Sequence, residues 1–313
     1  MDRIEIVNLF RKDKIFLTPE VLDILVNNVQ IIDKVKEKCL RDNVFLVDIQ
    51  YLRKILEEDV EIRIEYPEEV KEFKVDDIIL QLKERLEYLS SLIIQNNQLK
   101  EIYSIGRLSR IKKDFDSGIV VGLVKEKTTY TFTLEDISGN MIIKGEAKDI
   151  EKINIDEVLG VEVFRENESF IAKKLFFPSF SFFRKIFKLN RDVIFKYDSC
   201  IVNGVEFKIK TDSAVRLYVG DVKIFVLNFN LIRPYFHENY LEDVCLLLEK
   251  RHLNPTIVKN GKLYKNDFFM LRDIPEYIII VDSPENVKKI YKGVQIFFLR
   301  KDSSVDLKKG EFL

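Results

Sequence analysis

Few residues of this chain have the types and spacing that metal or nucleophilic chemistry needs. Its two histidines, His237 and His252, each lack a second histidine at ligand spacing, whereas a two-metal phosphoesterase needs clustered His, Asp and Asn ligands. The Gly220-Asp221 pair resembles a fragment of a phosphoesterase motif, but its apolar flanks favour a plain hairpin turn. No phosphate-binding loop, dinucleotide fingerprint or nucleophile elbow occurs in the sequence.

We therefore predict no catalytic residue, no bound metal and no cofactor. One catalytic alternative is a nuclease whose metal site is rebuilt from His237, Asp221 and nearby carboxylates. The three cysteines, Cys39, Cys200 and Cys245, form no close pair, which indicates a reducing compartment and argues against disulfides or a zinc knuckle.

A basic and aromatic run is the second candidate for chemistry. Between residues 168 and 196, seven Lys and Arg residues stand against two acidic ones, which gives a local charge of +5. Aromatic rings stack on bases and cations pair with phosphates. The alternative without a ligand is that the phenylalanines pack in a core and that the cations lie in solvent at the edge of this core. The predicted nucleic-acid-binding residues are Tyr130, Phe132, Lys144, Lys173, Lys174, Arg184, Lys185, Lys188 and Arg191.

The element that must position these side chains is a series of short strands in residues 118–183. Five β-branched or aromatic runs, separated by turn residues, follow one another there and partly alternate between apolar and polar residues. Five strands in so short a segment fit a small barrel, for which the OB-fold is the common solution.

The flanking segments differ from the barrel. Residues 1–58 have apolar residues at helical spacing, and Thr18-Pro19 is typical of a helix start. Residues 59–75 are acidic and predict a linker or a solvated edge strand, and residues 75–95 predict a helix. Beyond residue 193, hairpin strands precede a helix at 240–250, a buried strand at 277–281, a short helix at 285–289 and a strand at 294–299. The fold class is therefore α+β.

Composition adds little about function. The chain has 313 residues with a net charge of -1, so a basic surface would have to be local. With 46% hydrophobic and 33% charged residues it is globular, and no signal peptide or membrane-length apolar run occurs in it. The abundance of Lys, Glu and Ile would suit a thermophile.

The order of segments resembles the small subunit of archaeal D-family DNA polymerase and, more distantly, the B-subunits of eukaryotic replicative polymerases. The resemblance covers most of the chain, and it depends on the succession of several segments rather than on one motif. The segments that carry it are 16–20, 75–90, 134–139, 156–161, 176–178, 246–255, 273–277 and 291–294.

The departures from this family concern its metal site. In active members, ligand motifs fill the first half of a calcineurin-like phosphoesterase domain, but nothing similar occurs here in residues 178–197. A later family histidine falls near Asn228, and the terminal Gly-His-x-His falls near residues 281–284. His252 matches a family position that is not a metal ligand. The resemblance therefore implies an inactivated, truncated small subunit that keeps its docking surfaces.

This resemblance divides the chain into an N-terminal helical domain (1–58), an acidic linker and helix (59–100), an OB-fold domain (101–183) and a truncated, degenerate phosphoesterase-like domain (184–313). It implies a non-catalytic scaffold in DNA replication, in the cytoplasm and associated with the nucleoid. Its partner would be a polymerase catalytic subunit or another replication protein, with DNA as a further ligand. The alternative function is that of a single-stranded nucleic-acid-binding OB-fold protein.

Overall fold

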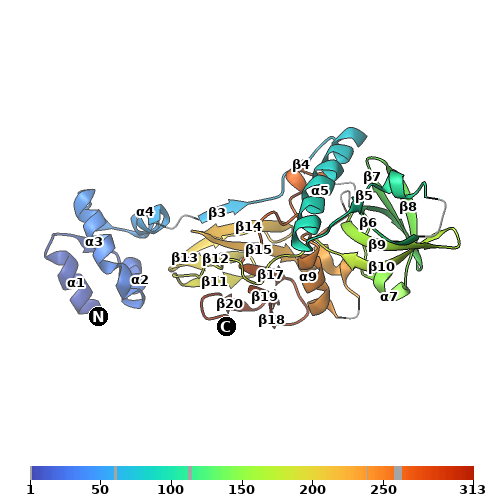
Figure 1. Ribbon diagram of the computed structural model, residues 1–313. Helices are drawn as coiled ribbons and strands as arrows, with labels where there is room; N and C mark the ends of the chain where they lie inside the picture. Colours follow the sequence, from blue (N-terminus) through green and yellow to red (C-terminus); the bar gives the residue numbers. More distant parts are fainter. Residues whose placement is uncertain (1, 60–61, 112–114, 238, 257–262) are drawn as a thin grey trace.

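Three parts follow one another along an elongated molecule in the computed structural model, which describes residues 2–59, 62–111, 115–237, 239–256 and 263–313 (Figure 1). A helical bundle lies at one end, a two-layered β-sandwich with helices on one side lies in the middle, and a β-barrel lies at the other end. Within the described ranges, no helix is both long enough and apolar enough to cross a membrane.

The bundle consists of two helix–strand–helix units whose short strands pair in parallel. The predicted helix start is confirmed, because Thr18 is the N-cap residue and Pro19 is the first helical residue, although the Thr18 side chain makes no capping bond. The apolar faces of the helices meet in a core that includes Phe10, Leu25 and Leu52. The elements are α1 (Arg3–Arg11), β1 (Phe16–Leu17), α2 (Pro19–Asn27), η1 (Val29–Ile31), α3 (Ile32–Arg41), β2 (Leu46–Val47) and α4 (Ile49–Asp59).

The barrel closes because its first strand pairs with both its second and its fourth strand. Its strand order is β6-β7-β8-β10-β9 and back to β6, with β8 and β10 parallel and the other pairs antiparallel, which is an OB-type arrangement. The five predicted strands are present, while the helix α7 between the third and fourth was not predicted. The elements are β5 (Ile102–Tyr103), α6 (Ile105–Leu108), β6 (Phe115–Lys127), β7 (Thr131–Asp136), β8 (Gly139–Lys144), α7 (Ala147–Glu151), β9 (Val158–Glu166) and β10 (Ser169–Phe176).

Helix α5 (Val75–Asn96) precedes the barrel and packs against the outer side of β6 and β9. Its apolar stripe buries Leu89 and Ile93 against Val121 and Val158. Asp77 accepts a hydrogen bond from the Lys74 backbone, so a carboxylate lies at the positive end of the helix.

The sandwich consists of two sheets, ordered β13-β12-β11-β20-β21 and β18-β19-β17-β15-β14-β3. Phe195, Leu217 and Phe297 belong to the core between them, and Leu248 and Phe298 belong to a second core beneath α8 and α9. The elements are β11 (Val193–Lys196), β12 (Ser199–Val202), β13 (Val205–Lys208), β14 (Ala214–Val219), β15 (Val222–Asn228), α8 (Phe229–Ile232), η2 (Arg233–Tyr235), α9 (Tyr240–Glu249), η3 (Lys265–Asp267), β17 (Tyr277–Val281), β18 (Val287–Tyr291), β19 (Val294–Leu299), β20 (Ser304–Asp306) and β21 (Glu311–Phe312).

Two segments of the sandwich refine the sequence predictions. The acidic segment before α5 contains an edge strand, β3 (Ile62–Glu65), which pairs with β14, and a second short strand, β4 (Glu69–Val70), which pairs with β16 (Leu263–Tyr264). The short helix predicted at 285–289 is wrong, because β18 pairs with β19 over its whole length. Val287 and Tyr291 on one face of this strand pack against the core, whereas Lys288 and Ile290 on the other face are exposed.

Candidate functional site

The outer face of β7 and β8 brings together two of the predicted binding residues. Tyr130 is 65% exposed in the loop before β7, and Lys144 is exposed opposite Thr131 at the end of β8. Ile142, 63% exposed, lies on the same face opposite Thr133. This face is the open side of the barrel, since α5 covers the side made by β6 and β9.

Phe132 and Arg184 must be removed from the predicted binding residues. Phe132 is 1% exposed in the barrel core, so its ring cannot stack on a base. The alternation of Thr131, Phe132 and Thr133 already indicates that the aromatic ring points inward. The Arg184 guanidinium donates to the Ile274 and Pro275 carbonyls and to Glu276 at 3.1 Å, so it anchors a chain segment instead of meeting solvent.

The remaining predicted cations are divided between two domains. On the barrel, Lys173 is ion-paired to Glu162 at 2.8 Å, and Lys174 lies over the Phe176 ring at 4.8 Å. Lys185 lies over Phe187 at 4.4 Å, in the connection from β10 to β11 that packs against the sandwich. Lys188 is exposed and Arg191 half-buried in this same connection.

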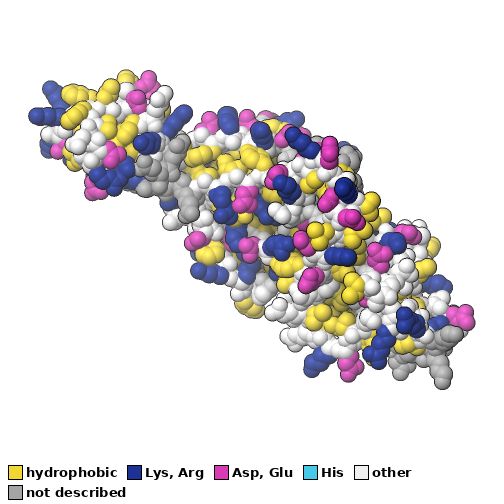
Figure 2. Space-filling view, turned by 90° about the horizontal axis from the view of Figure 1, so that it is seen from above, with side chains coloured by type: hydrophobic (Ala, Val, Ile, Leu, Met, Phe, Trp, Pro, Cys, Tyr) yellow, Lys and Arg dark blue, Asp and Glu magenta, His cyan; other side chains and the backbone are white. Residues whose placement is uncertain are grey.

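The charge of the barrel is unfavourable for phosphate binding. Residues 115–176 contain eight Lys and Arg residues and twelve Asp and Glu residues, a net charge of −4. Positive and negative side chains are interspersed along the molecule when it is seen from above (Figure 2). At the ends of β7 and β8 that are paired with each other, Tyr130 and Lys144 therefore lie on an acidic module.

The sheet edge where the family's metal ligands would fall is occupied by structural interactions. Asn228, at the end of β15, accepts a hydrogen bond from Asn230 as the cap of α8 and donates to the Thr211 carbonyl at 3.1 Å. Asp282, after β17, lies 3.4 Å from Lys301 Nζ. Within the described residues, no group of three or more His, Cys, Asp and Glu side chains is placed to hold a metal ion.

The alternative nuclease site does not assemble. Asp221 lies in the turn before β15, whereas His237 pairs with Asp243 at 3.2 Å near the start of α9. Tyr240 of the same helix bonds to Glu285, beyond the far end of β17. Asp221 and His237 therefore lie at opposite ends of the seven-residue strand β15, roughly 20 Å apart, and cannot share an ion.

A buried arginine joins α5, the barrel and the sandwich domain. Arg85 is 1% exposed, and its guanidinium bonds both oxygens of Asp267, at 2.7 and 3.0 Å. The same group donates to the Asp156 carbonyl of the barrel at 2.7 Å and to the Pro255 carbonyl. One side chain thus satisfies acceptors from two domains, and a planar, permanently charged group suits this task.

His252 also belongs to this cluster, and both of its ring nitrogens make hydrogen bonds. Its Nε2–H donates to Asp267 Oδ1 at 2.8 Å, and its Nδ1 accepts from the Asn254 backbone at 3.2 Å. Burial and the Arg85 charge lower the pKa of His252, so the ring is neutral at neutral pH. Although burial alone would raise it, the His252 and Arg85 groups lower the pKa of Asp267 below its ordinary value. A histidine with both nitrogens bonded has no lone pair left for a metal ion.

A second buried pair supports the same junction. Lys250 after α9 bonds Glu157 before β9 at 2.8 Å, and it also donates to the Lys152 carbonyl. Glu157 accepts two further bonds from Asn154, so both of its oxygens are satisfied. We call Arg85, Asp267, His252, Lys250 and Glu157 the interdomain clamp. These bonds connect the barrel, α5 and the sandwich through charged groups that are almost completely buried.

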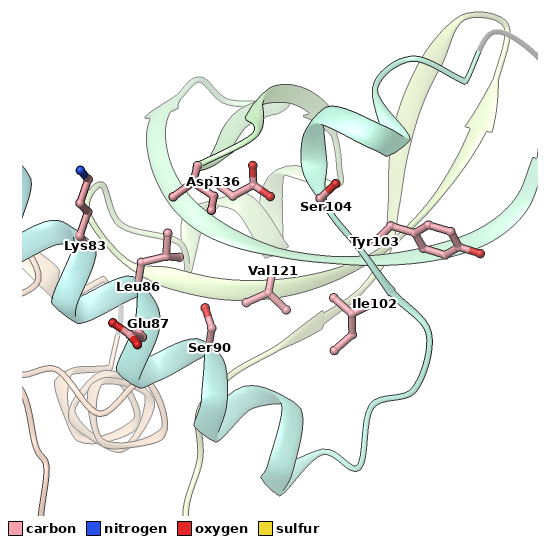
Figure 3. A pocket seen from close by; sticks show the side chains of 10 residues that line it. Lys83, Leu86, Glu87, Ser90, Ile102, Tyr103, Ser104, Val121 and Asp136 are labelled. Carbon is pink, nitrogen blue, oxygen red and sulfur yellow. The ribbon is translucent and has the colours of Figure 1, made fainter.

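An apolar groove lies between α5 and the barrel (Figure 3). It has a volume of about 500 Å³ and continues into a smaller cavity of about 160 Å³ that shares Lys83, Leu86, Asp136 and Ile137 with it. Leu86 on α5 faces Val121 across the groove, and Ile102 forms its other end. The sequence did not predict this groove, because it is formed by segments that are distant in the chain.

Comparisons with known proteins assign no family. No protein family and no curated protein sequence matches the chain. The crystal structure of the S. pombe Stn1–Ten1 complex is similar at 15% identity and a TM-score of 0.21, over 25% of this chain and 74% of that one. The structure of the hypothetical protein YgiW from E. coli is similar at 10% identity and a TM-score of 0.21, over 24% and 88%. Neither similarity identifies a function or a partner.

Proposed function

We propose that the chain is a non-catalytic accessory subunit of a replicative DNA polymerase. In this proposal the sandwich is a shortened calcineurin-like phosphoesterase domain, the barrel is its OB-fold companion, and the helical bundle is a tether. The order of bundle, α5, barrel and two-sheet sandwich agrees with the order of segments in the small subunits that the sequence resembles.

The observation that carries the proposal is the interdomain clamp. It uses charged groups that are almost completely buried, and their desolvation is costly unless every partner is in place. Such a junction contributes little net stability but fixes one relative orientation of the two domains, and a surface shared by both domains stays preformed for a large partner.

The two histidines support the same proposal. His252 is a clamp residue and His237 pairs with Asp243, so both imidazoles take part in structural bonds, while Asn228 stands near a position where the family has a ligand histidine. All three cysteines are buried, and burial raises the pKa of Cys39, Cys200 and Cys245, to about 11, 12 and 11, so none presents a thiolate nucleophile.

Affinity purification of the tagged full chain from its native cells tests this function. We expect a DNA polymerase catalytic subunit to be recovered in near-stoichiometric amount, while the untagged strain yields none. Repeated recovery of the chain without any polymerase or replication protein would show the proposal to be wrong.

Single-stranded nucleic-acid binding is the second candidate, because the exposed residues Tyr130 and Lys144 lie beside each other where the Gly145 backbone donates to the Tyr130 carbonyl at 3.0 Å. Titration of a labelled oligonucleotide at low salt compares the native chain with Lys144→Glu and with Lys148→Glu, a matched exchange on α7. Salt-dependent binding that is lost only in Lys144→Glu would favour this second function. Equal, weak binding by all three chains would leave the accessory-subunit proposal standing.

A further inference from the structure

The apolar heptad stripe of helix α5 is longer than the part of this helix that is buried against the barrel. Apolar residues recur at spacings of four and three, which is the a/d pattern of a helix that packs against another helix. The C-terminal part, Leu89 and Ile93, is fully buried against the barrel. We call the six positions the α5 seam: Val75, Ile79, Leu82, Leu86, Leu89 and Ile93.

The N-terminal half of this seam is exposed. Val75 and Ile79 are 69% and 42% exposed, and Leu82 and Leu86 are half-buried at the wall of the groove. Across the groove, Ile137 in the β7–β8 turn is 92% exposed. A contiguous apolar patch of this kind marks an interaction site more often than scattered single residues do.

The groove beside the seam can accept apolar side chains. Its floor includes Val121, Leu123 and Ile102. Its rim carries Lys83, Glu87, Glu135 and Asp136, and Lys125 pairs with Glu135 at 3.2 Å, so the charges at the rim sum to −1. The acidic excess disfavours an acidic ligand and favours a basic one.

We propose that the exposed half of the α5 seam binds an amphipathic helix of a partner protein, with Leu or Ile at heptad spacing and Lys or Arg on its flanks. The seam continues directly from the interface that α5 makes with the barrel, so a docked helix extends an existing apolar core. Helix-in-groove recognition uses the same i, i+3, i+4 and i+7 anchors. The site does not depend on the partner being a polymerase, and it goes beyond the function proposed above.

A peptide-display selection tests this site with the purified full chain. The library consists of 21-residue helices with Leu or Ile at a and d and with Lys, Glu or Gln varied at the flanking positions. We expect selected peptides to be enriched in Lys at the flanks. One selected peptide is then titrated by fluorescence anisotropy against the chain and its variants.

The double variant Ile79→Lys/Ile137→Lys should weaken binding at least tenfold. Both side chains are exposed, so circular dichroism should stay unchanged. The matched control is Ile142→Lys, an exposed isoleucine on the open barrel face, which should bind like the native chain. Glu87→Lys should shift the preference toward peptides with Glu at the flanks.

Three results would overturn the proposal. The first is selection of peptides that bind the double variant as well as the native chain. The second is selection without any basic preference. The third is a chain that is dimeric in sedimentation and becomes monomeric with Ile79→Lys, because the seam would then be occupied by a second copy.

Discussion

The sandwich has two neighbours, and it holds them in different ways. The barrel is joined to it by the interdomain clamp, in which one arginine bonds groups from both sides. The helical bundle meets it through the β12–β13 hairpin, where Val205 is buried in the bundle core and Phe207 is partly buried against it. The first junction combines this buried, directional network with an apolar cluster that includes Met270 and Leu89, and the second is a small apolar contact.

The two junctions therefore differ in how firmly they fix the relative orientation of the domains that they join. A directional charged network stabilises one orientation and penalises all others, because any displacement leaves a buried charge unpaired. An apolar contact is non-directional and tolerates sliding. We therefore expect the barrel and sandwich to move together and the bundle to move relative to them.

The largest effect is expected from breaking the clamp at Arg85. Arg85→Ala leaves Asp267 buried without its main partner and should lower the free energy of unfolding by about 3–5 kcal/mol. Urea denaturation measures this loss. The control Arg63→Ala removes an exposed arginine that pairs with Glu65, and it should cost less than about 1 kcal/mol. Equal losses in the two variants would contradict a role for the clamp.

A smaller effect is expected when both members of the second pair are removed together. Glu157→Leu leaves Lys250 buried and unpaired, whereas Glu157→Leu with Lys250→Met replaces two charges by apolar groups of similar size. The double variant should be more stable than the single one by about 1 kcal/mol or more. A double variant that is less stable than the single one would show that the pair does not act as a unit.

The bundle junction should respond to a loss of apolar contact alone. Val205→Ala removes two buried methyl groups, should cost about 1.6 kcal/mol and should loosen the bundle while the sandwich stays folded. Small-angle scattering should show an increased radius of gyration. The same substitution at Val219, within the sandwich core, should lower stability without changing that radius.

The pH dependence of stability tests whether His252 of the interdomain clamp is buried and neutral. Because the pKa of His252 is lowered in the folded chain, the unfolded chain takes up a proton first as the pH falls below about 6.5. Stability should fall there by up to about 1.4 kcal/mol per pH unit, and the lowered pKa of Asp267 adds a further loss below about pH 4. In thermal unfolding, the variant His252→Gln should not show the loss of stability that begins below about pH 6.5 in the native chain. An unchanged profile in that variant would show that His252 is not buried and neutral.

Local patterns predicted the regular elements well. Helix α5, the five barrel strands and the hairpin strands beyond residue 193 follow from periodicity and turn chemistry that a few neighbouring residues contain. The edge strand β3 also shows alternation of isoleucine and charge, although its acidic surroundings favoured a linker equally.

The clamp could not be predicted, because its partners are far apart in the sequence. In the sequence Arg85 is one of several charged residues between the apolar positions of α5, and its partner Asp267 lies 182 positions away. The hydrophobic periodicity of the sequence carries no information about two residues that are this far apart. The groove beside α5 was missed for the same reason, since Leu86, Ile102 and Ile137 come from three separate elements.

Native-state hydrogen exchange tests the central claim most directly, which is that the barrel, α5 and the sandwich form one cooperative body. With rising denaturant, amides of α5, β9 and β17 should lose protection together, and the bundle helices should lose it earlier. In Arg85→Ala the barrel and sandwich amides should separate into two groups. Loss of barrel protection well before that of the sandwich in the native chain would contradict the account.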